Sequence, residues 1–105
     1  FFYEWEGLAR LFDLSEVDKI YHGKKGDIVF EKAVDAFFEE KPDFLFLNID
    51  EIDHHGHHDG HDSKAYFNAI THYDSLIGNF TQRLEEEGLL NETLIMITGD
   101  HGGIK

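Results

Sequence analysis

The sequence predicts an α/β fold with a mostly parallel sheet and flanking helices, and three observations support this prediction. Phe44 to Ile49 is an apolar run interrupted only by Asn48, which is typical of a strand covered on both faces. A second apolar run, Leu94 to Thr98, lies downstream. A long stretch with helical apolar spacing joins the two runs, so strand, helix and strand follow one another as a βαβ unit with a right-handed crossover.

The first half of the chain predicts a strand and a helix before the Phe44 run. Phe1 to Trp5 is aromatic and can form the end of a strand. Asp27 is a good N-cap residue for the helix that follows. Pro42 ends this helix, because the residue before a proline avoids the α region. The apolar residues of the helix recur at i, i+3 and i+4 spacing: Phe30, Ala33, Val34, Phe37 and Phe38.

The second half predicts a histidine-rich loop followed by a long helix. Asp62 or Ser63 can cap this helix, and Gly88 is a plausible C′ residue after its last turn. The apolar residues keep a period of about 3.6 residues, which predicts one buried face. They are Tyr66, Ala69, Ile70, Tyr73, Leu76, Ile77, Phe80 and Leu84.

Charge and composition exclude several classes of partner. The chain has 105 residues, with 22 Asp and Glu against 9 Lys and Arg, and a formal net charge of -13. That balance argues against a surface for nucleic acid or for an anionic membrane, because both require clustered basic side chains. There is no cysteine, so a disulfide framework and thiolate metal ligands are excluded. No apolar run approaches the about 20 residues that a membrane span needs.

Acids and histidines crowd the segment between Asp50 and Gly60, directly after the first apolar run. Imidazole and carboxylate groups suit zinc and other first-row divalent ions. Two Asp-x-x-x-His pairs overlap here, Asp50 with His54 and Asp53 with His57. Because Gly56 permits a tight turn between Asp53 and His57, we favour that pair. A solvated loop that binds metal only adventitiously is the alternative.

The second apolar run ends in Asp100 and His101, which are framed by Gly99, Gly102 and Gly103. Adjacent side chains in an extended segment diverge, so both residues can be ligands only where the loop bends. An exposed histidine in a turn is the alternative. Because α/β sheets bind ligands beyond the carboxyl ends of parallel strands, we expect the two segments to lie side by side. Their separation would suit a two-metal site, with ions about 3.5–4 Å apart.

The segments Asp53-His54-His55-Gly56-His57 and Gly99-Asp100-His101-Gly102 together resemble the alkaline phosphatase superfamily. The similarity is greatest to its type I phosphodiesterase/nucleotide pyrophosphatase and sulfatase-like branches, and it covers about residues 30 to 103. It implies a partial alkaline-phosphatase-like core. We therefore expect residues 1–105 to be a single partial α/β domain, part of a larger metallohydrolase domain.

The resemblance implies that Asp53 and His57 bind one metal ion and that Asp100 and His101 bind a second. The family usually uses zinc, and an Asp-His pair fits zinc better than the calcium of sulfatases. The family's nucleophile lies upstream of the matched region and a third His ligand lies downstream, so neither is assigned here. Asp50 with His54 remains an alternative pair. Four histidines exceed the family pattern: His54, His55, His58 and His61.

The implied function is hydrolysis of phosphate monoesters or diesters at a site with two divalent metal ions. A small phosphate or sulfate ester would be the substrate, and a periplasmic or extracellular location is favoured. We expect the 105 residues alone to be inactive, because they lack the nucleophile. The alternatives are a sulfatase, a metal-dependent phosphomutase, a non-enzymatic His-rich metal-binding module and a structural piece without metal. Exposed edges of a partial sheet also predict self-association.

Overall fold

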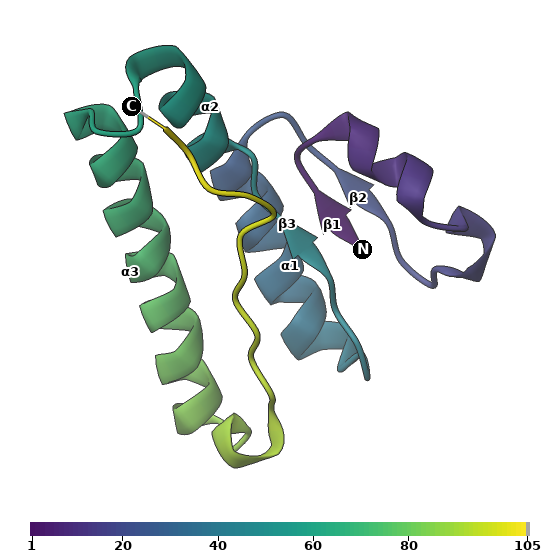
Figure 1. Ribbon diagram of the computed structural model, residues 1–105. Coiled ribbons are helices and arrows are strands. Elements are labelled where there is room, and N and C mark those ends of the chain that lie inside the picture. Colours follow the sequence, from purple (N-terminus) through teal and green to yellow (C-terminus); the bar gives the residue numbers. More distant parts are fainter. Residues whose placement is uncertain (105) are drawn as a thin grey trace. The chain divides into compact units, whose positions relative to one another are not determined.

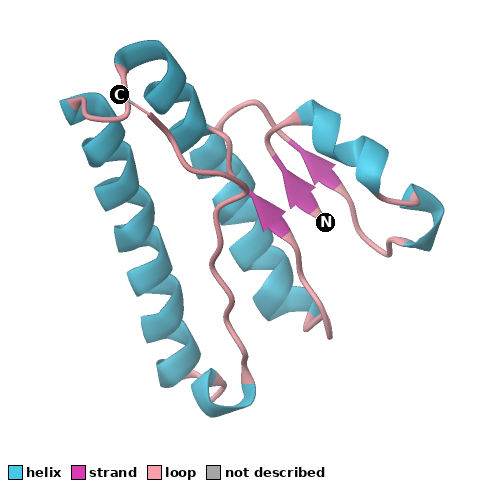
Figure 2. Ribbon diagram, in the orientation of Figure 1, coloured by secondary structure: helices cyan, strands magenta, loops and turns pink. Residues whose placement is uncertain are grey.

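The computed structural model describes residues 1–104. The chain forms two compact units, and the boundary between them lies between Glu51 and Ile52. The first unit contains the strands (Figure 2), and the second contains a long helix and an extended C-terminal segment, drawn in green and yellow in Figure 1.

The first unit contains a three-stranded parallel sheet. Its central strand β1 (Phe2–Tyr3) pairs with β2 (Tyr21–His22) and with β3 (Leu47–Asn48). Two 3₁₀ helices, η1 (Glu6–Leu11) and η2 (Leu14–Glu16), lie between β1 and β2 in the chain. The predicted parallel sheet with flanking helices is therefore confirmed. The strand predicted from Phe44 to Ile49 is shorter than expected, because only Leu47 and Asn48 join the ladder.

Helix α1 (Gly26–Glu40) covers one face of this sheet and builds the core of the first unit. Alternation along β1 explains the packing, since successive strand residues point to opposite faces. Phe2 packs with Val29, Ala33 and Ala36 on the α1 side. Phe1 and Tyr3 form an aromatic layer instead, in which their rings stack 4.4 Å apart.

The ends of α1 differ slightly from the prediction. Lys25 occupies the N-cap position, so the prediction of Asp27 as the cap is wrong. Asp27 lies in the first turn, where a carboxylate still interacts favourably with the helix dipole. The helix ends before Pro42 as predicted, with Lys41 in the left-handed conformation (φ 49°).

The histidine-rich segment is a helix, α2 (Glu51–Asp59), and its prediction as a loop is wrong. The Glu4 carboxylate accepts hydrogen bonds from the amides of Asp50 (2.7 Å) and Glu51 (3.0 Å). Amides at a helix start have no intrahelical partner, so this distant carboxylate supplies what the local sequence lacks. Gly60 follows the helix with φ 99°, a conformation that favours glycine.

Helix α3 (Lys64–Glu86) matches its prediction closely. The Ser63 side chain accepts a hydrogen bond from the Tyr66 amide at 3.1 Å, which makes Ser63 the N-cap. Gly88 adopts φ 72° after the C-cap, as a C′ glycine does. Neither α3 nor any other described helix is long and apolar enough to cross a membrane. The buried residues of α3 all belong to the predicted stripe: Ala69, Tyr73 and Leu84.

The prediction of a buried strand from Leu94 to Thr98 is wrong for the part of the chain that the structure describes. After η3 (Leu90–Glu92) this segment is extended but belongs to no sheet ladder there. Leu94 is 85% exposed and Met96 is 84% exposed. A strand needs a neighbour that pairs with its backbone groups, and apolar composition alone does not supply one.

Candidate metal centre

Helix α2 places Asp53 and His57 on one face, because residues four apart lie one above the other on an α-helix. Asp53 Oδ1 lies 3.2 Å from His57 Nε2. The favoured pair therefore comes together, but not for the predicted reason. Gly56 forms no tight turn and lies inside α2. Asp50 precedes the helix, and within residues 1–104 it belongs to no cluster of three metal-ligand side chains.

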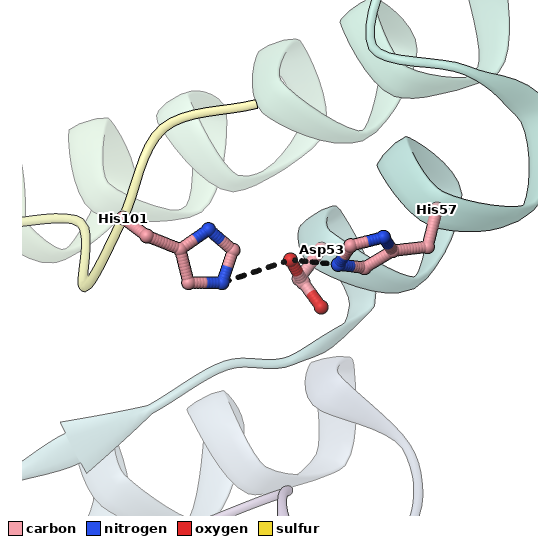
Figure 3. Close-up of side chains that lie close together, drawn as sticks. All are labelled: Asp53, His57 and His101. Atoms are coloured by element: carbon pink, nitrogen blue, oxygen red, sulfur yellow. Dashed lines mark ion pairs between the residues drawn. The ribbon is translucent and has the colours of Figure 1, made fainter. Parts of the chain in front are cut away.

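His101 reaches the same carboxylate from the C-terminal segment. Its Nε2 lies 3.5 Å from Asp53 Oδ1, and the ring centroids of His57 and His101 are 6.2 Å apart. Figure 3 shows Asp53 between the two imidazoles. One ligand atom from each of the three residues lies within 4.8 Å of the others. The two segments expected to lie side by side therefore meet at Asp53.

Asp100 stands apart from this group. Its side chain is 87% exposed, and its Oδ2 lies 3.6 Å from His101 Nε2. The described cluster of ligand atoms contains Asp53, His57 and His101 but not Asp100. The structure thus brings together three of the four predicted ligands and leaves the fourth carboxylate directed to solvent.

The backbone orients His101 for metal binding. Its Nδ1 lies 2.8 Å from the carbonyl oxygen of Gly102. A carbonyl only accepts hydrogen bonds, so Nδ1 donates, and in the neutral ring Nε2 is the nitrogen that can bind a metal ion. The bond to Gly102 is the largest cause of a raised pKa of His101, and the charges of Asp100 and Asp53 raise that pKa further.

His61 holds the C-terminal segment, a role that the sequence analysis did not assign. Its Nδ1 lies 3.0 Å from the carbonyl oxygen of Ile104. A Cβ atom at Gly103 would lie 2.1 Å from the His61 ring, and one at Gly56 would lie 2.5 Å from it. Both positions therefore require glycine while His61 keeps this place. The glycines at 56 and 103 are the sequence signal, although their shared neighbour becomes visible only in the structure.

An open pocket of about 670 Å³ adjoins His57. This volume lies within the range of roughly 300–1,000 Å³ that is typical of small-molecule sites. Glycines contribute much of the lining, so backbone groups as well as imidazoles face the space. The lining residues are Gly56, His57, Gly60, His61, Gly102, Gly103 and Ile104.

The three-residue cluster fits a divalent cation. Zinc bonds to imidazole nitrogen and carboxylate oxygen measure about 2.0–2.2 Å, so two ligands at a tetrahedral angle lie roughly 3.4 Å apart. Asp53 Oδ1 lies 3.2 Å from His57 Nε2 and 3.5 Å from His101 Nε2, close to that spacing. Each imidazole therefore stands at the spacing from Asp53 Oδ1 that ligands of a zinc ion have.

Comparisons with known proteins agree with the resemblance noted in the sequence. The family model described as type I phosphodiesterase / nucleotide pyrophosphatase matches residues 5–105. Ectonucleotide pyrophosphatase/phosphodiesterase family member 1 of Mus musculus is 29% identical over 109 residues, which covers 95% of this chain and 12% of that protein. The chain therefore spans about an eighth of the length of that curated relative. No solved structure matches the chain.

Two sulfatases match a shorter part of the chain. An arylsulfatase of Clostridium perfringens is 47% identical over 38 residues, or 36% of this chain and 8% of that protein. An ulvan-active sulfatase of Formosa agariphila is 43% identical over 42 residues, or 40% of this chain and 7% of that protein. These matches agree with the resemblance to the alkaline phosphatase superfamily, which includes phosphodiesterases and sulfatases.

Proposed function

Because the chain belongs to the type I phosphodiesterase / nucleotide pyrophosphatase family, we propose that it forms part of a metal-dependent hydrolase of phosphate monoesters or diesters. The observation that carries this proposal is the meeting of Asp53, His57 and His101, whose ligand atoms lie within 4.8 Å of one another. The ligands come from segments more than 40 positions apart in the sequence, and the adjoining pocket has the size of a small-molecule site.

We assign Asp53 and His57 to one divalent cation and Asp100 and His101 to a second, with zinc as the metal. The contact of Asp53 with both imidazoles supports adjacent sites. The exposed Asp100 carboxylate is free to turn toward an ion. Such ions polarise a phosphoryl oxygen and lower the pKa of a bound nucleophile. The contribution of this chain is to hold the imidazoles in the ligand tautomer, as the Gly102 carbonyl does for His101.

The nucleophile and a third histidine ligand belong, in this proposal, to parts of the protein outside these 105 residues. The chain covers 12% of the mouse relative, which supports its place within one larger domain. The 105 residues alone are then expected to bind metal without turning over substrate, since positioning and a nucleophile supply most of the rate.

The test uses the full-length protein that carries this sequence. It should hydrolyse 4-nitrophenyl phosphate or bis(4-nitrophenyl) phosphate, lose activity in a chelator and regain it with zinc. Asp53→Asn and His101→Asn should abolish turnover, whereas His72→Ala on α3 should not, because His72 lies outside the cluster. Chelator-resistant activity, or normal activity in Asp53→Asn, would refute the proposal.

A sulfatase is the second candidate, and the matches to an arylsulfatase and an ulvan-active sulfatase favour it. Those matches cover 36% and 40% of the chain, whereas the phosphodiesterase family match covers residues 5–105, so we rank phosphate esters first. Parallel assays with 4-nitrophenyl sulfate and bis(4-nitrophenyl) phosphate separate the two. Faster turnover of the sulfate ester would reverse the ranking.

A further inference from the structure

Helix α2 carries three pairs of side chains at i, i+4 spacing, and only one of them belongs to the centre described above. Asp53 pairs with His57, His54 with His58, and His55 with Asp59. Each residue of an α-helix turns the chain by about 100°, so each pair is rotated by about 100° from the one before. The His54 and His58 pair therefore lies on a different side of the helix from Asp53 and His57.

The imidazoles of His54 and His58 lie together in solvent. Their ring centroids are 5.8 Å apart and the rings are nearly parallel, at 16°. The side chain of His58 is 74% exposed, and His54 is exposed as well. The ring of His55 lies 5.9 Å from that of His54, so three imidazoles gather at this end of the helix.

Asp59 sets the orientation of two of these rings. Its Oδ1 lies 2.9 Å from His58 Nδ1, and its Oδ2 lies 2.8 Å from His55 Nδ1. These hydrogen bonds also lower the pKa of Asp59, with the bond from His55 as the largest cause. An ionised carboxylate only accepts hydrogen bonds, so both Nδ1 atoms donate, and Nε2 is the nitrogen left to bind a metal ion in each neutral ring. A carboxylate behind a metal-binding histidine has this effect in known sites.

We propose that His54 and His58 form an auxiliary site for a late first-row divalent cation, with Asp59 orienting His58 from behind. Two imidazoles on adjacent helical turns chelate such an ion once their exposed side chains rotate to bring the Nε2 atoms roughly 3.4 Å apart. Imidazole ligands select Zn²⁺, Ni²⁺ or Cu²⁺ over Mg²⁺ and Ca²⁺. The net charge of -13 favours any cation at this surface.

This site is independent of the proposed hydrolase. It shares no ligand with Asp53, His57 and His101, and it needs no other part of a larger protein. Because His54 and His58 lie one turn apart on α2, they are fixed as ligands only while the helix is formed, so the bound ion would stabilise α2. Metal binding here is therefore coupled to the helicity of the segment that carries Asp53.

Isothermal titration of the 105-residue chain with Zn²⁺ tests this inference, with Mg²⁺ as the negative control. The wild-type chain should show a binding event that His54→Ala and His58→Ala each weaken at least about tenfold. His72→Ala removes an exposed imidazole from α3 and should change nothing. Zinc binding at His54 and His58 should persist in Asp53→Asn, which removes a ligand from the cluster of Asp53, His57 and His101. Circular dichroism of each variant checks that the helices are kept.

Asp59→Asn gives a second, independent readout. It keeps His54 and His58 but removes the negative acceptor behind His58, so Zn²⁺ affinity should fall about 10- to 100-fold while the stoichiometry stays the same. An isotherm unchanged by His54→Ala and His58→Ala would overturn the inference. So would loss of all zinc binding in Asp53→Asn. If zinc binds at His54 and His58 but not at the cluster of Asp53, His57 and His101, the hydrolase proposal is refuted and the auxiliary site stands.

Discussion

The two halves of the candidate metal centre are built in different ways. Asp53 and His57 lie on α2, where backbone hydrogen bonds fix the spacing of residues four apart. Asp100 and His101 lie in an extended segment that joins no ladder among the described residues. The contact of His61 with Ile104 ties that segment to the end of α2. One half is therefore held by the helix itself, and the other depends on a few side-chain contacts.

Exposure follows the same division. The Asp53 side chain is 37% exposed and touches both imidazoles, whereas the Asp100 side chain is 87% exposed. The Asp53 carboxylate already contacts both imidazoles, whereas ordering the exposed Asp100 side chain on an ion would cost conformational entropy. These exposures indicate that Asp53 joins the two halves, and that the C-terminal half should be the easier one to disturb.

Substitution of Asp53 should break both halves at once and give the largest effect. Asp53→Asn keeps the size of the side chain but removes the charge that faces His57 and His101. Zinc affinity of this centre should fall by at least about 100-fold, because the loss of a ligand exceeds the usual cost of losing a supporting group. Isothermal titration on the His54→Ala background isolates this event from the auxiliary site.

The matched control is Asp74→Asn on α3, an exposed aspartate outside the cluster. It removes the same charge from the chain, so a non-specific effect of net charge would appear in both variants. Equal losses in the two variants would show that Asp53 acts only through charge and is not a ligand.

Substitution of Gly103 should break only the C-terminal half. Gly103→Ala puts a Cβ atom 2.1 Å from the His61 ring, so the ring and the segment cannot both keep their places and the contact that holds the segment is disturbed. Gly102→Ala is the control, since a Cβ atom there meets nothing within 4 Å. Zinc affinity should fall about tenfold in Gly103→Ala, which corresponds to the loss of well-oriented support, and should change little in Gly102→Ala.

Removal of the His61 ring tests whether its clash with the new Cβ atom causes the loss of zinc affinity in Gly103→Ala. The double variant His61→Ala/Gly103→Ala has no clash between the new Cβ atom and the ring. Gly103→Ala should therefore reduce zinc affinity less on the His61→Ala background than in the wild-type chain. A double-mutant cycle of zinc affinities measures that coupling. Additive effects would mean that His61 and Gly103 act separately, against the contact seen here.

Much of the fold could be predicted from local patterns. The sheet-forming apolar run, the stripe of α3, and the turn residues Ser63 and Gly88 all act over a few positions, so the sequence displays them directly. The histidine-rich segment meets the Asp-His-Gly segment as expected, but the rule for parallel strand ends does not explain it, because residues 94–98 join no ladder in the described part of the chain. The family resemblance is confirmed by the match over residues 5–105.

The errors concern contacts between distant residues. The amides of Asp50 and Glu51 at the start of this helix bond to Glu4, a partner 47 positions before Glu51, and no pattern within the segment reveals those bonds. The run Leu94 to Thr98 has the composition of a strand, but a ladder requires a neighbour that composition does not specify. His61 was grouped with surplus histidines because its contacts with Gly103 and Ile104 span more than 40 positions.

The pH dependence of zinc binding should distinguish His101 from an ordinary imidazole. The bond to Gly102 and the charges of Asp100 and Asp53 raise the pKa of His101 above 6.5. Protons therefore compete with zinc at this residue from a higher pH, and affinity should decline as the pH falls through the raised pKa. Without metal, folding stability depends on pH in the opposite direction to zinc affinity. The contacts of protonated His101 stabilise the fold below pH 6.5, and this effect is lost as the pH rises through the raised pKa of His101.

Titration of the ring signals by NMR in a chelator gives the pKa of His101 directly. Asp100→Asn should lower it, but only in part, because the larger contribution from Gly102 remains. A pKa of His101 at or below 6.5 in the wild-type chain would contradict the orientation described for this ring.

The smallest expected effect comes from the turn that leads from α3 into the C-terminal half. Gly88 has φ 72°, so Gly88→Ala should destabilise the chain by about 1 kcal/mol, the usual cost of a left-handed non-glycine residue. Gly78→Ala, inside α3 with nothing within 4 Å of the new Cβ, should stabilise it by about 1 kcal/mol. Urea denaturation measures the change in stability of both variants.

If the C-terminal half is held by its side-chain contacts, neither Gly88→Ala nor Gly78→Ala should alter zinc affinity by more than about twofold. That is small against the about tenfold loss of affinity expected when a supporting group is removed. A large loss in Gly88→Ala would instead show that the turn, and not His61, sets the position of His101.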